Sequence, residues 1–212
     1  MIGLLEERAD QVREVRRVLD RYLVEIVEHY DLCPWARTSR TGGELAVEIL
    51  WGTPTVEAWV AASERAFASS TIRVAMLVAP ELEITRHALH DVRDRVAKRA
   101  DALGIAEFHP SATYDGQTPA RLVPFLRRAP DPLLQCVPLA LLDQVRGPPL
   151  TVERSAQIAM LVRAGGIHAV KPPIADRIAA ANHARVPQHE FEAKLTAITD
   201  DRRASYARLG IA

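Results

Sequence analysis

TIRVAMLVA, residues 71–79, is a nearly continuous apolar run rich in β-branched residues. Such a run is typical of a strand that is covered on both faces. The preceding segment ELAVEILW (44–51) has an apolar side chain at every second position, which predicts another strand. IAEF (105–108) predicts a third. The first half of the chain is therefore expected to supply three short strands to one sheet.

The two connections between these strands have helical patterns. Thr53-Pro54 predicts a helix start, a capping hydroxyl followed by proline in the first turn, and the helix is expected to run to about Ser69. Thr85 is expected to cap the next helix, which stops at Gly104. This order favours an α/β fold with a βαβαβ core and a small, mostly parallel sheet wrapped by helices. A ferredoxin-like antiparallel sheet would need hairpin signals, and we find none.

Other elements are expected on either side of this core. Residues 3–30 have apolar side chains at three- and four-residue steps, which predicts a long amphipathic helix ending at Asp31–Pro34. RTSRTGG (37–43) is predicted to be a loop. Beyond the third strand, Thr118-Pro119 begins a short helix and LLQCV (133–137) can form a further strand.

The C-terminal region is predicted to be all-helical. Gly147-Pro148-Pro149 marks a candidate boundary between an α/β core domain with the N-terminal helix (1–146) and a helical extension packed on it (147–212). ALLDQVR, just before this boundary, also has a helical pattern. The helices expected in the extension run from Thr151 to Gly165-Gly166, over about 174–184 and from about 188 to 209.

Composition and charge are those of an ordinary globular protein. Of 212 residues, 48% are apolar and 25% are charged, and the formal net charge is zero. A balanced charge favours neither nucleic acid nor an anionic membrane as a partner. The N-terminus is charged from its sixth residue and lacks the apolar stretch of a signal peptide. Cys33 and Cys136 are far apart and are expected to be thiols. We therefore expect a soluble cytoplasmic protein.

The predicted topology creates a candidate binding edge. Open α/β sheets bind ligands beyond the carboxyl ends of their parallel strands. Here that edge would carry Gly52-Thr53, Pro80-Glu81 and His109-Pro110-Ser111. The start of the helix after Thr53 would offer free amides to an anion. His109 would be placed to meet a ligand, or, alternatively, to bond a loop carbonyl.

The remaining candidates each have a functional and a structural interpretation. Arg127-Arg128 could hold a carboxylate or phosphate bidentately, or lie on a solvated surface. Cys33 follows a helix C-terminus, which is the wrong end for lowering a thiol pKa, and a buried packing role is the alternative. His87 and His90 lack the spacing and glutamate of a zinc motif, so we interpret them as surface residues.

Three motifs together resemble a known family. DLCPWA (31–36), AEFHP (106–110) and RRAPDPLLQ (127–135), in this order, resemble the bacterial domain-of-unknown-function family numbered 1415. The similarity covers roughly residues 10–146. The family has no established activity, so the resemblance implies positions rather than a reaction. Those positions are Cys33, Pro34, His109, Pro110, Arg128, Pro130 and Pro132.

The sequence departs from the family pattern at four positions. Ala129 stands where the family has serine, Asp131 where it has tyrosine, and Gln135 where it has histidine. Pro138 falls where an arginine is expected. If the family's site uses that hydroxyl and second imidazole, the chemistry of this chain is altered.

Three functions compete on this evidence. The first is an enzyme acting on a small anionic molecule by general acid–base or thiol chemistry. The second is a non-catalytic module that binds a ligand or partner, including a homodimer formed through the amphipathic helices. The third is a metal site of Cys33 and His109, to which Cys136 could add a third ligand. No cofactor motif indicates a particular cofactor.

The enzyme hypothesis assigns the site as follows. His109 is the general acid or base and Cys33 the nucleophile or a ligand. Both are predicted to line one pocket, with Arg128 close to the bound anion. The substrate-binding candidates are Arg127, Arg128, Thr53 and Ser111.

Overall fold

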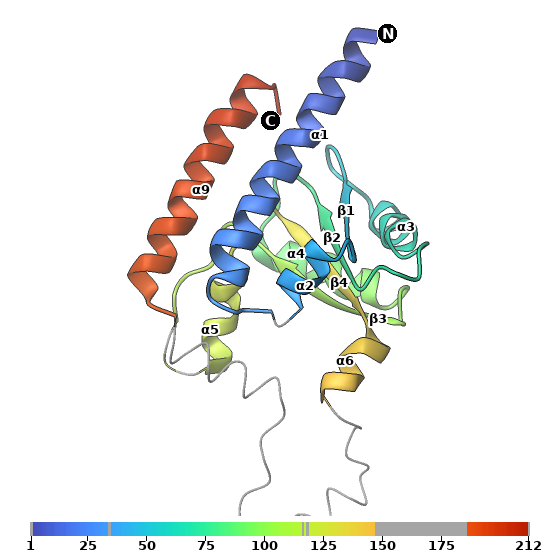
Figure 1. Cartoon of the computed structure of the whole chain (residues 1–212), viewed down its shortest axis with the longest axis vertical. Coiled ribbons are helices and arrows are strands. Elements are labelled where there is room, and N and C mark those ends of the chain that lie inside the picture. The colour runs from blue at the N-terminus through green and yellow to red at the C-terminus, as the bar shows by residue number, and fades with distance from the viewer. Residues whose placement is uncertain (1, 34, 116, 118, 147–185, 212) are drawn as a thin grey trace, which may run out of the picture.

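The computed structural model describes residues 2–33, 35–115, 117, 119–146 and 186–211, and a four-stranded sheet forms its centre (Figure 1). The strands follow one another across the sheet in the order β1-β2-β4-β3. Their bounds are Leu45–Ile49 (β1), Val74–Val78 (β2), Leu103–Phe108 (β3) and Leu133–Pro138 (β4).

The sheet is mixed. β1 and β2 pair in parallel, whereas β4 pairs antiparallel with both β2 and β3. The three strands expected from the sequence therefore run in the same direction, but the fourth is inserted between the second and the third. The βαβαβ order is confirmed, because α3 (Val56–Ala66) connects β1 to β2 and α4 (Arg86–Ala97) connects β2 to β3.

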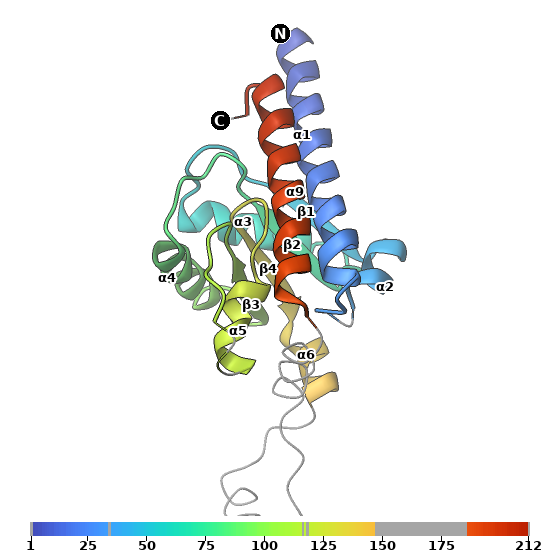
Figure 2. The ribbon, with the colours of Figure 1, turned by 90° about the vertical axis from the view of Figure 1, so that its left-hand side faces the viewer.

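Helices cover both faces of the sheet. On one face, α3 and α4 bury Trp59 and Leu89 against Leu77 and Leu134 of the strands. The other face is covered by α1 (Ile2–Tyr22), α5 (Pro119–Leu126) and α9 (Gln188–Arg208). Figures 1 and 2 show α1 and α9 side by side and antiparallel, with both chain termini at the same end. The apolar sides of these two helices thus meet within the chain.

The N-terminal helix changes its winding before it ends. The predicted helix is present as α1 and continues as a π-helix over Leu23–Glu28. Asp31 then adopts a positive φ of 53°, which turns the chain away from the helix axis. A short helix, α2 (Ala36–Thr41), follows where a loop was predicted. It lacks apolar periodicity and is held by an ion pair between Arg40 and Glu28, with 2.6 Å from Nε to Oε1.

Two helix boundaries differ from the prediction. α3 begins after Thr55, whose hydroxyl accepts a hydrogen bond from the amide of Ala58, so Thr53 is not the cap. α4 is capped by Thr85 as predicted but ends at Ala97, and Gly104 lies in β3. A Cβ on Gly104 would clash with the side chain of Leu142 in α6 (Leu139–Arg146), so this glycine permits close packing rather than stopping a helix.

The C-terminal helix belongs to the same core as α1. Phe191, Leu195 and Tyr206 of α9 are buried with α1 and α5. The predicted boundary at 147–149 and the helices expected over 151–166 and 174–184 lie outside the described residues. No helix in the described part of the chain is both long and apolar enough to cross a membrane.

Candidate functional site

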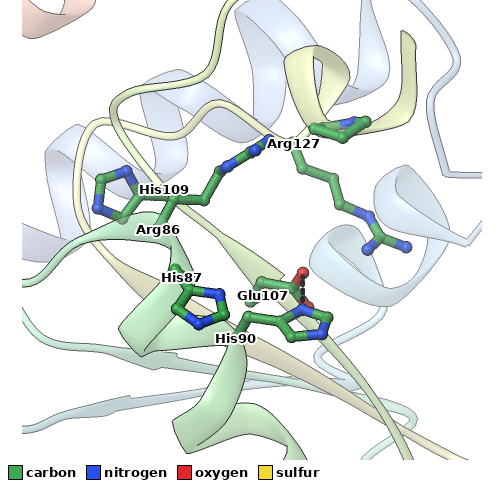
Figure 3. A pocket seen from close by; sticks show the side chains of 7 residues that line it. Arg86, His87, His90, Glu107, His109 and Arg127 are labelled. Carbon is green, nitrogen blue, oxygen red and sulfur yellow. Dashed lines mark hydrogen bonds and ion pairs between the residues drawn. The ribbon is translucent and has the colours of Figure 1, made fainter. Parts of the chain in front are cut away.

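A pocket of about 360 Å³ lies at the carboxyl end of the edge strand β3. This volume is in the range of small-molecule sites. Figure 3 shows side chains converging there from the start of α4, from β3 and from the end of α5. The lining residues are Arg86, His87, His90, Glu107, His109, Pro124 and Arg127.

The pocket lining contains an imidazole–carboxylate pair. Nδ1 of His90 lies 3.1 Å from Oε1 of Glu107, and Nε of Arg93 lies 3.1 Å from Oε2 of the same carboxylate. Burial raises the pKa of Glu107, but the hydrogen bond from His90 and the charges of Arg127 and Arg93 outweigh it, so the pKa is lowered. A carboxylate can only accept here. When Nδ1 carries the proton and donates it to Glu107, Nε2 is the nitrogen that can take another proton. Nη2 of Arg93 lies 2.9 Å from Nδ1 and 3.1 Å from Nε2, which is compatible with either tautomer.

Two arginines give the pocket its positive charge. Arg127 is half-buried, and Arg86 is exposed at the start of α4. Within the described ranges, neither guanidinium has a hydrogen bond or an ion pair. Burial lowers the pKa of Arg127, partly opposed by the charge of Glu107. The nitrogens of Arg127 are not among the fully buried unpaired atoms, so water in the pocket can hydrate the guanidinium where the chain supplies no acceptor.

His109 lines the pocket but is tied into the loop. Its Nε2 lies 2.8 Å from the carbonyl oxygen of Ile84, to which it must donate. Nδ1 accepts from the amide of Ser111 at 3.0 Å and lies equally close to the Ser111 hydroxyl. With both nitrogens engaged and 8% of the residue exposed, His109 corresponds to the structural alternative raised by the sequence.

Cys33 does not line this pocket, so the expected shared pocket with His109 is not the one the structure forms. The thiol lies on the α1 face of the sheet, where it bonds to the side chain of Gln135. Burial raises the pKa of Cys33, which disfavours the thiolate.

The proposed metal set is not assembled. Cys136 is buried on the opposite, α3–α4 face, as strand alternation requires for the neighbour of Gln135. The two cysteines therefore cannot join His109 around one ion. No group of three potential metal ligands occurs among the described residues.

The other expected binding residues are only partly brought together. Arg127 lines the pocket, whereas Arg128 bonds the carbonyl oxygen of Pro110 and lies over the ring of Phe125. Ser111 is adjacent through its contacts with His109. Thr53 is exposed in the bend before α3 and is not part of the pocket lining.

The sequence interpretation missed His90, Glu107 and Arg86 as site residues. A signal was present for Glu107, because Leu103, Ile105 and Glu107 alternate onto one face of β3 and the glutamate interrupts an apolar pattern. Its partner on α4 could not be found without knowing how that helix crosses the strand. Comparisons with protein-family models, with curated proteins and with solved structures found no match to this chain.

Proposed function

We propose that the protein is an enzyme that acts on a small molecule bearing a carboxylate or phosphate group, by general acid–base catalysis in the pocket at the end of β3. The observation that carries the proposal is the half-buried guanidinium of Arg127, which has no acceptor among the described residues and lies beside an imidazole–carboxylate pair. The resemblance to family 1415 is part of the same proposal and names no reaction.

The arginines supply the binding part of this function. A guanidinium offers planar donors that match the oxygens of carboxylate and phosphate. Arg127 is already partly desolvated, so an anion that pairs with it recovers an interaction that the chain itself does not provide. Arg86 extends from the other side of the pocket toward the end of α5 (Figure 3) and adds a second positive charge.

The pair of His90 and Glu107 supplies the chemical part. When the substrate gives a proton to Nε2 of His90, the ring becomes cationic, and the carboxylate of Glu107 stabilises that charge through the bond at Nδ1. The proton returns to the product from the same nitrogen. Cys33 is not assigned a nucleophilic role, because burial raises its pKa and it lies outside the pocket lining.

A non-catalytic anion-binding module is the second candidate, and one contact favours it. Nη2 of Arg93 lies 3.1 Å from Nε2 of His90 and can donate to the one nitrogen that would act as base. Catalysis requires Arg93 to give up this contact when substrate binds, whereas simple binding does not.

The binding step is tested with inorganic phosphate and acetate by calorimetry and by the shift in melting temperature. We expect Arg127→Gln to abolish binding of both anions. Arg203→Gln, which changes an exposed arginine on α9, serves as the matched control and should bind as the wild type does. Equal binding by wild type and Arg127→Gln would overturn the proposed site.

The catalytic step is tested by screening small phosphate- and carboxylate-bearing molecules for turnover by NMR. We expect His90→Asn to lose turnover while it retains anion binding, and His189→Asn, on the exposed side of α9, to retain both. Anion binding with no turnover of any compound would favour the binding module.

A further inference from the structure

The charged groups that line the pocket do not balance one another. Among the described residues, the lining contains two guanidinium groups, those of Arg86 and Arg127, and one carboxylate, that of Glu107. This carboxylate is already paired with Arg93, whose Nε lies 3.1 Å from Oε2 and which is not part of the lining. The two guanidinium groups have no such partner in the described ranges. The lining therefore has an excess of two positive charges.

The imidazoles of the lining do not reduce this excess. His109 donates from one ring nitrogen and accepts at the other, both with backbone groups, so its ring holds one proton and no charge. A second proton on His87 or His90 would only add positive charge. The carboxylates of Asp91 and Asp94 face these two imidazoles at 3.8 and 3.7 Å, but both lie outside the lining and are half-exposed, so water screens them.

The two arginines extend from two chain segments that His109 holds together. Arg86 is the first residue of α4, and Arg127 directly follows α5. The backbone amide of His109 donates to the carbonyl oxygen of Arg127 at 3.1 Å. Its Nε2 donates to the carbonyl oxygen of Ile84, two residues before Arg86, at 2.8 Å. One residue thus fixes both segments at the same cavity, and Figure 3 shows Arg86 extending across it toward the end of α5.

The start of α4 adds to the positive potential of the pocket. Its first two residues, Arg86 and His87, belong to the lining. The hydroxyl of Thr85 accepts from the amide of Ala88, whereas the amides of Arg86 and His87 have no acceptor within the helix. The helix dipole places a partial positive charge at this end. The helix end and the two guanidinium groups therefore act on a bound anion in the same direction.

We propose that Arg86 and Arg127 together select a ligand with two negative charges, so that the substrate class of the pocket is a small dianion, either a phosphate monoester or a dicarboxylate. A phosphate monoester carries about 1.5 to 2 negative charges at pH 7 and three oxygens that can accept from both guanidinium groups. A dicarboxylate supplies one carboxylate to each arginine. A monoanion leaves one positive charge without a partner. This inference rests on the proposed function, which leaves the charge of the ligand open.

Matched pairs of anions test the charge of the ligand. Sulfate and methanesulfonate have similar tetrahedral groups but differ by one negative charge, and succinate and butyrate differ in the same way. In calorimetry at constant ionic strength, we expect a dianion to bind about 10- to 100-fold more tightly than its monoanionic partner, as for one additional hydrogen bond to a charged group. A preference confined to sulfate indicates a phosphate group, and one confined to succinate indicates a dicarboxylate. Equal affinities within both pairs would overturn the inference.

Arg86→Gln separates this inference from the proposed function. The variant should bind the preferred dianion about 10- to 100-fold more weakly and keep its affinity for the monoanion, which needs only Arg127. Arg95→Gln is the matched control, because it removes an exposed arginine of the same helix that is not part of the lining. It should keep the full preference for the dianion.

The possible results lead to different conclusions. If Arg86→Gln discriminates between the anions as the wild type does, while Arg127→Gln loses binding, the dianion inference is wrong and the pocket stands. The same conclusion follows if Arg95→Gln weakens dianion binding as much as Arg86→Gln, because the effect is then one of overall charge. If the wild type binds none of the four anions, the proposed function fails and this inference fails with it.

Discussion

Replacing Asp131 by alanine should destabilise the fold more than a surface change on α9, the helix to which its carboxylate bonds. Asp131 is 1% exposed at the entry to β4, and its carboxylate accepts from Nε of Arg202 at 2.6 Å and from the hydroxyl of Tyr206 at 2.8 Å. Arg202 also donates to the carbonyl oxygen of Pro80 at 2.7 Å. The carboxylate thus joins α9 to the ends of two central strands.

The magnitude follows from what remains after the carboxylate is removed. Breaking a buried ion pair by deleting one partner costs about 3–5 kcal/mol. The side chain of Arg202 keeps 22% exposure, so water can partly hydrate it, and we expect the lower end, about 3 kcal/mol. For a chain of this length that corresponds to a fall in melting temperature of about 6–12 °C.

Urea unfolding followed by tryptophan fluorescence measures this loss. Asp200→Ala is the control, because Asp200 forms an exposed pair with Arg203 on the same helix and should change the free energy of unfolding by about 0.5 kcal/mol or less. Equal stability of Asp131→Ala and Asp200→Ala would refute the reasoning. A double-mutant cycle with Arg202→Ala then isolates the pair from the stacking of Arg202 on Tyr206.

Three further predictions concern the pH dependence, the thiols and the strand-end histidine. The hydrogen bond from Arg40 lowers the pKa of Glu28 below its ordinary 4.5. The contribution of this ion pair to stability is therefore complete above pH 4.5 and is lost as the pH falls through the lowered pKa. The difference in unfolding free energy between wild type and Glu28→Gln should shrink on acidification, and a constant difference would contradict this. Burial raises the pKa of Cys33 and raises the pKa of Cys136 to about 12. At neutral pH, iodoacetamide should therefore modify Cys33 of the folded protein more slowly than free cysteine and should not modify Cys136, as measured by mass spectrometry. Rapid modification of Cys33 would show an activated thiolate. His109→Ala should lower the free energy of unfolding by about 1–3 kcal/mol, because the carbonyl of Ile84 and the amide of Ser111 lose their hydrogen-bond partner. A variant as stable as the wild type would show that the imidazole is available to bind a ligand.

The strands could be predicted from the sequence because each has a local apolar pattern. Which strands lie next to one another in the sheet could not be predicted. Within the run over 71–79, the strand β2 (Val74–Val78) is buried on both faces as predicted, whereas Thr71 and Arg73 are exposed. The pattern of LLQCV predicts a further strand but not its place in the sheet. Burial at Leu133, Leu134 and Cys136 puts apolar side chains on both faces of β4, as in an interior strand. The position of such a strand in the sheet depends on the path of the chain through α5, and the sequence of the strand itself does not indicate that path.

The sequence predicted a site at the end of the third strand, where the structure forms a pocket, but it did not predict the contacts between the side chains of that pocket. The end of the third strand and the arginines after α5 could be selected because strand direction and residue type are visible in the sequence. The pairing of His90 with Glu107 depends on the crossing of α4 over β3, and that of Asp131 with Arg202 joins residues far apart in the chain. Neither contact follows from spacing. His109 was selected for its position and is instead held by two backbone groups at that position.

The insertion of β4 also explains why the pocket lies beside β3 and not at the centre of the sheet edge. In an all-parallel sheet the crevice beyond adjacent strand ends would be open to a ligand. Here that position is occupied by the segment that leads into the antiparallel β4. The carbonyl oxygen of Pro132 in this segment accepts a hydrogen bond from the amide of Ala79 at 3.0 Å. Asp131 and Arg202 occupy the adjoining space. Among the described residues, the pocket instead lies on the outer side of β3, where α4 and the end of α5 flank the end of the strand. The backbone bond from His109 to Arg127 fixes that flank, so the arginine that would hold an anion is positioned by the same histidine that the sequence had singled out as a catalyst.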